Sequence, residues 1–369
     1  MRKYLIVLIS LFLYGCQSNQ EINNLSIVNS MGIDIQDNKY VISIQILNTN
    51  KKDENDQENM EQSLVYTTTG NNISEALNNF FVKTPKKLYL GHLSLVLVSE
   101  KLAKNDINNM TDYFLRNSEV SKNFTMLVSK DGKIEDTLKK LETNTTYPTG
   151  SILGSVEVSS NVQGRGIDVK FTKFMSDLNI KGKNPILGAI SINEDNLSIN
   201  HIAVFKGEKL VGYLNEDENI GYNFITDNIK NININYKCNK NNYIGINITN
   251  SKTTMSNKFK NGKPVFYLNI DADASITEAN CIDEIDNLDA VKNEVENEID
   301  KYVKEVIRVT KEDFNSDIFG FGRLLYQNNY SYFKNIENDW DNKIYRTLNI
   351  KTNINIRLTN KGSILKTVR

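Results

Sequence analysis

The chain contains 369 residues, of which 39% are hydrophobic and 24% are charged. This length suffices for two or three domains of roughly 100–200 residues each, and this composition is typical of a globular protein with true cores. The net charge of −1 argues against the clustered basic excess by which proteins bind nucleic acids, so we expect no nucleic-acid partner.

The first residues have the layout of an export signal. Residues 4–13 form an apolar run that is too short to cross a bilayer, which needs about 20 apolar residues. The run ends in Leu13-Tyr14-Gly15-Cys16, a pattern typical of a lipobox, in which a peptidase cleaves before a cysteine that carries diacylglycerol. The sequence therefore predicts a signal peptide at residues 1–15 and a lipidated tether at residues 16–24. An ordinary secretory signal and an uncleaved signal anchor are the alternatives.

Lipidation of Cys16 would place the protein on a membrane rather than in it. A diacylglycerol group carries two acyl chains, and two chains hold stably where one chain does not. No later stretch of the sequence approaches transmembrane length. We therefore expect a water-soluble body that is anchored on the outer face of a bacterial membrane.

Residues 25–184 alternate between strand-like and helical patterns, which predicts a mixed α/β region with a subdomain boundary near residues 140–150. Residues 51–62 are charged and lack apolar periodicity, so we interpret them as a surface loop. Ser74 is a candidate N-cap of a short helix. The apolar residues of that helix are expected to face inward, namely Ala76, Leu77, Phe80 and Phe81. The other expected elements are strands within 25–47, 64–69, 93–98 and 124–128, helices at 103–116 and 133–141, and a polar, mixed stretch from a turn at 147–150 to about residue 184.

Pro185 opens the second expected unit, a C-terminal α/β domain of residues 185–369. Asn215 is expected to cap a helix whose first turn is acidic, the end that favours negative charge. A long helix is expected at about 287–311, because apolar residues recur there every three or four positions in one stripe that would lie on a sheet. Strands are expected around it at 190–192, 199–205, 210–214, 229–236, 243–249, 265–276 and 347–359. Together the elements predict an α+β fold of mixed sheets with flanking helices, in three subdomains.

The sequence lacks the patterns that carry common enzyme chemistry. Its two histidines, His92 and His201, lie in or beside apolar strand-like segments, and neither pairs with a cysteine at catalytic spacing. There is no P-loop, no GxGxxG after a strand and no HExxH, and the acidic clusters Asp271-Ala272-Asp273 and Asp283-Glu284 lack the frame of an EF-hand. We therefore expect a non-enzymatic protein without a catalytic residue, a metal or a cofactor.

Two cysteines remain beyond the lipobox, Cys238 and Cys281. In an exported protein they could form one disulfide, and they could equally be two buried thiols. Nothing in the sequence brings their Cα atoms within the ~4.4–6.8 Å that a disulfide requires. Both alternatives therefore stay open.

Several segments that follow the lipobox are informative in their order and spacing. They are Glu21-Ile22, Leu25-Ser26-Ile27-Val28, Gly32-Ile33-Asp34, Pro85-Lys86-Lys87-Leu88-Tyr89-Leu90-Gly91-His92, Ala203-Val204-Phe205, Lys209-Leu210-Val211-Gly212-Tyr213-Leu214, Ser316-Asp317-Ile318-Phe319-Gly320-Phe321-Gly322 and Trp340-Asp341. Together these segments resemble the Ger(x)C family, the C subunits of spore germinant receptors. The resemblance extends over essentially the whole mature chain, and one departure is Gln17-Ser18, where the family often has an aromatic and an acidic residue.

The resemblance implies a lipoprotein of the inner spore membrane that acts in germination with two membrane-spanning partners, the A and B subunits. It also implies a three-domain mixed α/β ectodomain without enzymatic activity; whether this subunit binds a nutrient itself stays open. Three of the resembling segments supply candidate contacts with the partners, although a turn before a helix, for Asp317–Gly322, and a buried strand, for Pro85–His92, are the alternative interpretations. The candidate residues are Pro85, Lys87, Gly91, His92, Asp317, Phe319, Gly320, Phe321, Gly322 and Trp340.

Two functions from other classes are the alternatives. A substrate-binding lipoprotein that feeds a transporter would have two similar lobes around a ligand cleft, and the sequence shows no internal repeat. A cell-wall enzyme would need a catalytic acid or nucleophile, which the motifs do not supply.

Overall fold

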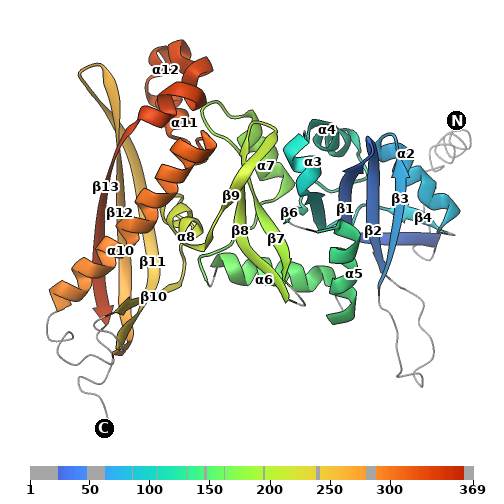
Figure 1. Ribbon diagram of the computed structural model, residues 1–369, viewed down its shortest axis with the longest axis horizontal. Helices are drawn as coiled ribbons and strands as arrows, with labels where there is room; N and C mark the ends of the chain where they lie inside the picture. The colour runs from blue at the N-terminus through green and yellow to red at the C-terminus, as the bar shows by residue number, and fades with distance from the viewer. Residues whose placement is uncertain are drawn as a thin grey trace, which may run out of the picture.

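A computed structural model describes most of the chain. The described residues are 24–47, 63–84, 86–105, 107–130, 132–144, 148–161, 163–193, 196–237, 242–279 and 288–360. The expected signal peptide, lipidated Cys16, the loop at 51–62, Pro85, Cys238 and Cys281 therefore lie outside the described residues. The described part is elongated, with a large mixed sheet toward the N-terminus and a smaller sheet at the opposite end (Figure 1).

The larger sheet has nine strands in the order β3-β2-β1-β5-β6-β7-β8-β9, and β4 pairs with the start of β1. The central strands β1, β5, β6 and β7 run parallel, and the outer pairs are antiparallel. The strand bounds are β1 Leu25–Gln36, β2 Lys39–Leu47, β3 Ser63–Gly70, β4 Lys87–Tyr89, β5 Leu95–Ser99, β6 Thr125–Lys130, β7 Ile186–Asn193, β8 Asn196–Lys206 and β9 Lys209–Leu214.

Helices cover both faces of this sheet, because its central strands are apolar on both sides. On β5, Leu95 and Leu97 face a core that includes residues of α5 and α6, whereas Val96 and Val98 face the core that includes residues of α3, α4 and α7. The helix bounds are α2 Ile73–Asn78, the 3-10 turn η2 Asn79–Val82, α3 Glu100–Asn105, α4 Asn108–Arg116, α5 Ile134–Asn144, α6 Pro148–Asn161 and α7 Phe171–Asn179.

The larger sheet crosses the division that we expected between residues 184 and 185. Pro185 precedes β7, which pairs in parallel with β6 and is followed by the antiparallel strands β8 and β9. Pro185 therefore stands before a strand that extends an existing sheet, so the proline by itself does not mark the start of a new sheet.

The smaller sheet has four strands in the order β10-β11-β12-β13. Its long hairpin, β11–β12, turns at Asn261 and Gly262, whose φ values of 51° and 73° fit the positive-φ turn that Asn-Gly favours. The long helix α10, Leu288–Val309, confirms the expected helix; it buries one apolar stripe and contacts β13 and β10. The strand bounds are β10 Ile232–Lys237, β11 Tyr243–Lys260, β12 Lys263–Ala279 and β13 Asn349–Asn360.

Helix α8, Glu216–Ile225, lies between the two sheets (Figure 1). Its N-cap is Asn215, as expected, and Glu218 completes a capping box. Gly221 allows α8 to lie against α10, because a Cβ there would come within 2.2 Å of the Tyr302 carbonyl oxygen. On the other side of α8, buried Asn219 donates to the carbonyls of Arg165 (2.8 Å) and Asn200 (2.6 Å).

Short helical elements connect α10 to β13. Their bounds are the π-helical η3 Thr310–Phe314, α11 Phe321–Asn328, α12 Tyr330–Ile336, η4 Glu337–Asp339, η5 Trp340–Ile344 and η6 Tyr345–Thr347. Trp340 begins η5, and α11 follows the turn at Asp317. Two expectations were wrong: the helix at 103–116 is two helices, and the stretch at 147–184 contains α6 and α7.

Candidate functional site

The carboxylate of Asp317 lies in the interior, where it accepts five hydrogen bonds. Its Oδ1 accepts from the backbone amides of Phe319 (3.2 Å), Gly320 (2.8 Å) and Phe321 (3.2 Å). Its Oδ2 accepts from the Gly322 amide (2.8 Å) and from the indole Nε1 of Trp340 (3.1 Å). One side chain therefore fixes the turn that starts α11 and ties that turn to the element that contains Trp340.

Glycines make this turn possible. Gly320 has a φ of 88°, which side chains with a Cβ rarely adopt. A Cβ on Gly322 would lie 2.6 Å from the Trp340 ring, and a Cβ on Gly182 would lie 2.3 Å from the Gly322 backbone. The chain therefore needs glycine at residues 182 and 322 because two backbones and an indole ring meet there.

The turn joins the two sheets. Asn184, just before β7, donates its backbone amide to the Asp317 carbonyl (2.7 Å) and its side-chain amide to Asp341 (3.0 Å). Ser316 donates to the carbonyl of Phe205 on β8 (2.6 Å). On the opposite side, the Phe321 ring packs on Phe266 of β12 with 5.1 Å between the ring centroids. We call Gly182, Asn184, Ser316–Gly322, Trp340 and Asp341 together the Asp317 joint.

Burial governs the electrostatics of the joint. Asp317 has no exposed surface, and its burial raises the pKa of the carboxyl to about 6, with a smaller contribution from nearby Asp341. The amides of Gly322 and Gly320 and the Trp340 indole oppose that rise in pKa by stabilising the charged form. The carboxyl thus combines an elevated pKa with a full set of donors.

The structure separates the candidate interface residues into two groups. Asp317, Phe319, Gly320, Phe321, Gly322 and Trp340 are all buried in the Asp317 joint, so their side chains hold the chain together and are not exposed for a partner. Lys87 and His92 are exposed at the N-terminal end of the larger sheet, and Gly91 is half-buried there. A Cβ on Gly91 would lie 2.5 Å from the Tyr89 ring, which itself packs edge-to-face on His92 (5.6 Å between centroids).

The two histidines differ from each other in burial. His201, on β8, is half-buried, and its Nδ1 lies 3.1 Å from the Leu214 carbonyl, which fits a structural role. His92 is exposed, and its ring is in edge-to-face contact with the Tyr89 ring. The expectation of a structural histidine therefore fits His201 better than His92.

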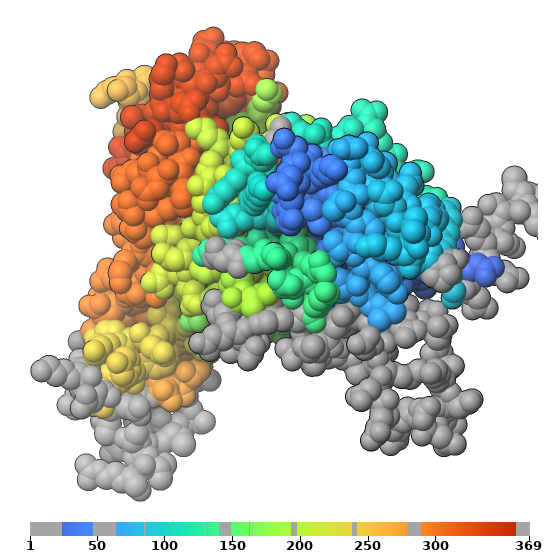
Figure 2. Space-filling view, turned by 45° about the vertical axis from the view of Figure 1, so that its right-hand side comes forward, coloured from blue at the N-terminus to red at the C-terminus, as the bar shows by residue number. Residues whose placement is uncertain are grey.

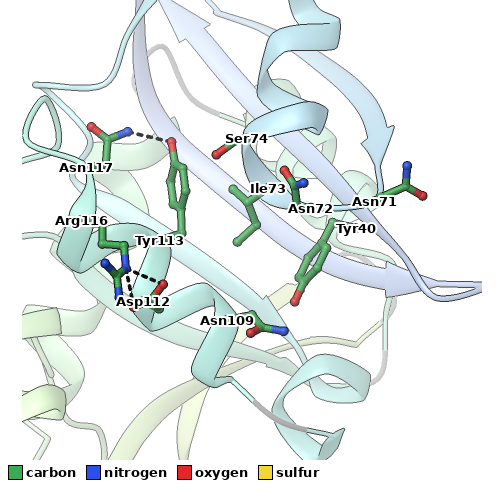
Figure 3. A pocket seen from close by; sticks show the side chains of 10 residues that line it. All are labelled: Tyr40, Asn71, Asn72, Ile73, Ser74, Asn109, Asp112, Tyr113, Arg116 and Asn117. Atoms are coloured by element: carbon green, nitrogen blue, oxygen red, sulfur yellow. Dashed lines mark hydrogen bonds and ion pairs between the residues drawn. The ribbon is translucent and has the colours of Figure 1, made fainter.

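A surface cavity of about 590 Å³ lies between the start of α2 and helix α4 (Figure 3). Tyr40, Asn72 and Ile73 face α4 across this cavity. On the α4 side, Arg116 is neutralised by Asp112, with 2.8 Å between Nε and each carboxylate oxygen. The cavity is therefore lined by amides and hydroxyls rather than by an unpaired charge, and sequence reasoning gave no signal for it.

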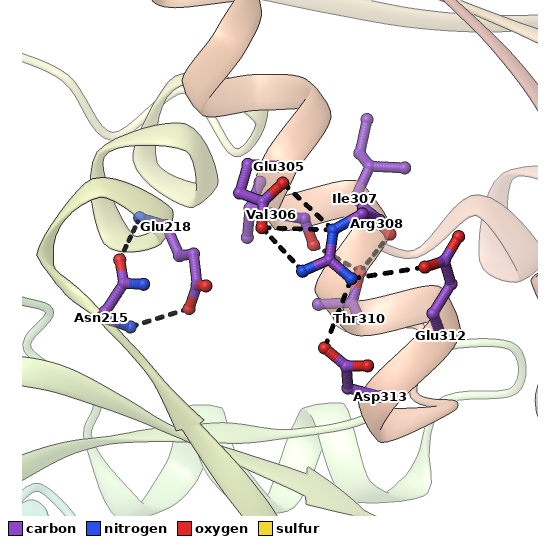
Figure 4. Close-up of polar contacts among 9 residues, drawn as sticks. All are labelled: Asn215, Glu218, Glu305, Val306, Ile307, Arg308, Thr310, Glu312 and Asp313. Carbon is purple, nitrogen blue, oxygen red and sulfur yellow. Dashed lines mark hydrogen bonds and ion pairs between the residues drawn. The ribbon is translucent and has the colours of Figure 1, made fainter.

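A second polar cluster lies where α8 approaches the end of α10 (Figure 4). Arg308 pairs with Glu305 (2.7 Å), Glu312 (3.3 Å) and Asp313 (3.6 Å), and the hydrogen bonds to Glu305 and Glu312 raise the pKa of the guanidinium. Burial raises the pKa of Glu218, whose carboxylate accepts from the Asn215 backbone. Asn215 and Glu218 thus form the capping box of α8, whereas Arg308 joins the end of α10 to η3 through its carboxylate partners.

In the described part of the chain, no group of three or more histidine, cysteine, aspartate or glutamate residues could hold a metal ion. No described helix is both long enough and apolar enough to cross a membrane.

Two family models match the chain. One, described as spore germination protein N-terminal domain, matches residues 18–192, and the other, described as spore germination B3/GerAC like, C-terminal, matches residues 200–362. The chain belongs to the Ger(x)C family. This Ger(x)C protein therefore has a role in spore germination. The second match includes most of β8 and all of β9, which complete the sheet of the first.

Relatives and one solved structure match along nearly the whole Ger(x)C chain. Spore germination protein KC of Bacillus subtilis (strain 168) is 24% identical over 385 residues, covering 96% of this chain and 94% of its own. Spore germination protein B3 of the same strain is 24% identical, covering 96% of each. The crystal structure of the GerBC protein superimposes with a TM-score of 0.58 at 20% identity, covering 89% of this chain and 97% of that one. That likeness confirms the mixed α/β fold.

Proposed function

We propose that this protein is the lipid-anchored C subunit of a nutrient germinant receptor, and that it works without catalysis. It assembles with the membrane-spanning A and B subunits on the outer face of the spore inner membrane. The observation that carries the proposal is the pair of family matches, which together extend from residue 18 to residue 362. The relatives are matched over nearly their own full length, so the similarity concerns whole germination proteins.

The Asp317 joint supports a scaffolding role. The resembling segment Ser316–Gly322 is used to fix one sheet against the other through Asn184 and Phe205. Buried, fully paired polar networks favour a single arrangement of the parts they connect. A subunit built in this way presents its two sheets to its partners in a fixed relation.

The proposed anchor supports assembly in a second way. Two acyl chains on Cys16 would confine the protein to the membrane that holds its partners. Confinement raises the effective concentration of one binding partner for another without any new contact. Weak contacts between the subunits would then suffice for assembly.

The alternative of a substrate-binding lipoprotein predicts two similar lobes. The two sheets here have nine and four strands in unlike orders, which does not favour that alternative.

Deleting the gene tests the receptor role. We expect spores to lose or slow their response to particular nutrients, while a trigger that bypasses the receptors still germinates them at the normal rate. Optical density and dipicolinate release would be followed side by side. Unchanged responses to every nutrient, in a strain whose other germinant receptors are also deleted, would contradict the proposal.

Replacing Cys16 tests the anchor. The Cys16→Ala protein should leave the membrane fraction, and the nutrient response should fall with it, since lipidation needs the thiol. Cys281→Ala is the matched control, and it should stay in the membrane fraction. A Cys16→Ala protein that remains on the membrane would refute lipidation at this residue.

A further inference from the structure

Two large apolar side chains are exposed on the turn η2. Phe81 is 57% exposed and Val82 is 92% exposed, whereas Phe80 beside them is fully buried. The sequence predicted that Phe81 would face inward, and this was wrong. Helix α2 ends at Asn78, and the chain continues as a 3-10 turn with three residues per turn, which carries Phe81 out of the core.

Lysines follow these apolar residues directly. Lys83 and Lys87 are exposed, and Lys86 is half-buried. The Lys83 ammonium donates to the Thr67 carbonyl (2.5 Å), which holds it beside η2 without neutralising its charge. Lys87 is paired with Glu119 at 3.3 Å. Apolar side chains with adjacent ammonium groups match the boundary of a bilayer with anionic headgroups.

This surface lies at the end of the molecule where the described chain begins. Strand β4 pairs with the first residues of β1, with Leu25 opposite Lys87 and Ile27 opposite Tyr89. The start of β1, in dark blue, projects from the end of the molecule that also carries the light-blue segment with η2 and β4 (Figures 1 and 2). Only eight peptide units separate Cys16 from Asn24, and so short a chain reaches at most ~29 Å.

Among the other exposed apolar side chains, Phe259 (39%) is also flanked by lysines, Lys258 and Lys260, but its ring packs edge-to-face on Tyr332 with 4.9 Å between centroids. Leu115 (54%) and Val158 (48%) stand alone on α4 and α6. At the opposite end of the molecule, Tyr330 (53%) packs edge-to-face on Tyr326 with 5.3 Å between centroids. Scattered or mutually packed apolar residues are ordinary on protein surfaces.

We propose that η2, with Lys83 and Lys86 beside it, is a membrane-contact site, in which Phe81 and Val82 are inserted at the headgroup–acyl boundary. Lys83 and Lys86 bind the anionic headgroups of the lipids around them. This proposal rests on the lipid anchor of the proposed function and adds a second attachment point. Two attachment points fix the orientation of the ectodomain on the membrane, whereas an anchor on a tether alone does not.

The decisive test places a tryptophan at the turn. The mature chain, lipidated at Cys16, is inserted into vesicles of phosphatidylcholine and phosphatidylglycerol that contain brominated lipid tails. Phe81→Trp reports on the site, and Tyr330→Trp at the far end is the matched control. The native Trp340 is 2% exposed and supplies a constant background. We expect the tails to quench the residue-81 fluorescence at least about twofold more than that at residue 330, because inserted side chains lie some 5–10 Å deep.

The outcomes are distinct. Equal quenching at residues 81 and 330, with the protein still on the vesicles, would overturn the membrane contact and leave the anchor standing. A protein that leaves the vesicles altogether would overturn the anchor, and the contact with it. If residue 81 is unquenched while Val82→Asp abolishes the nutrient response, the site binds a protein subunit and the membrane proposal is wrong.

A second measurement isolates the lysines. In the mature chain with Cys16→Ser, which carries no lipid, Lys83→Gln with Lys86→Gln should weaken cosedimentation with anionic vesicles by roughly 25-fold, since each lysine contributes about fivefold. Lys260→Gln with Lys263→Gln, on the exposed tip of the β11–β12 hairpin, is the control and should change little. Equal effects of the two pairs would show a non-specific charge effect and contradict the proposed site.

Discussion

The Asp317 joint and the turn η2 lie at different places in the fold. In each, the burial of the residues differs from one interpretation of the sequence, and the two differences are opposite. Asp317, Phe319, Gly320, Phe321 and Gly322 were candidates for an interface, with a turn before a helix as the alternative interpretation. They are buried and the Asp317 carboxylate is fully paired, which fits the alternative. Phe81 was a candidate core residue, and more than half of its side chain is exposed. The segment of residues 317–322, rich in glycine and phenylalanine, is therefore packed in the interior, whereas the apolar pair Phe81 and Val82 lies on the surface.

The difference has a physical cause in each place. At the joint, Asp317 satisfies backbone amides that would otherwise be buried without a partner, and such amides are costly. At η2, the change from α-helical to 3-10 geometry rotates the side chains that follow. Stability should consequently depend on the joint and hardly at all on the exposed side chains of η2.

The largest effect is expected for Asp317→Ala. The substitution leaves the amides of Gly320 and Gly322 and the Trp340 indole without their acceptor, so the free energy of unfolding should fall by about 3–5 kcal/mol. Urea unfolding followed by circular dichroism measures it. Asp112→Ala is the control: it removes an exposed pair with Arg116 and should cost at most about 1 kcal/mol. Similar losses for the two variants would refute the role of the joint.

The pH dependence of stability should be the next largest effect. Because burial raises the pKa of Asp317 from 3.8 to about 6, the folded protein holds this proton more tightly than the unfolded chain does. The stabilisation that comes from this tighter proton binding is therefore fully present below pH 4 and is lost as the pH rises through 6, whereas the hydrogen bonds that the carboxylate accepts from Gly320, Gly322 and Trp340 remain above that pH.

A comparison of variants isolates this contribution. The difference in unfolding free energy between the wild-type protein and Asp317→Asn should shrink by up to about 3 kcal/mol between pH 4 and pH 7. Urea titrations at several pH values measure it. A difference that grows with pH would show that the surrounding donors keep the carboxyl ionised despite its burial.

A matched pair of glycines tests the close approach in the joint. Gly182 and Gly262 have nearly the same φ, 72° and 73°, so alanine meets similar backbone strain at both. A Cβ at residue 182 would lie 2.3 Å from the Gly322 backbone, whereas nothing lies within 4 Å of a Cβ at residue 262. Gly182→Ala should therefore lower the free energy of unfolding, measured by urea titration, by about 1–3 kcal/mol more than Gly262→Ala does. Equal losses would mean that the backbones can separate without cost.

Features encoded within a few residues were predicted from the sequence. Asn215 caps α8 as expected because cap and helix are neighbours in the chain, and α10 was found from its apolar stripe. Helix α6 was missed because its sequence is rich in glycine and serine, with buried Ile152 and Val156 as its core contacts. Weak amphipathicity leaves little periodic signal.

Features that depend on distant residues were not predicted. The role of Asp317 depends on Asn184 and Trp340, which lie 133 and 23 residues away along the chain. No pattern in the sequence around Asp317 predicts those contacts. The continuation of the sheet past Pro185 depends on the pairing of β7 with β6. The cavity between α2 and α4 was not found because its walls come from three separate segments.

The smallest effect is expected at η2, where two adjacent phenylalanines form a matched pair. Phe80→Ala removes a fully buried ring and should cost about 3–5 kcal/mol of unfolding free energy. Phe81→Ala removes a ring that is 57% exposed and should cost about 0.5 kcal/mol. Urea unfolding of both variants measures the ratio. A loss at residue 81 close to that at residue 80 would show that the Phe81 ring is packed in solution, and then it would not be free to enter a membrane.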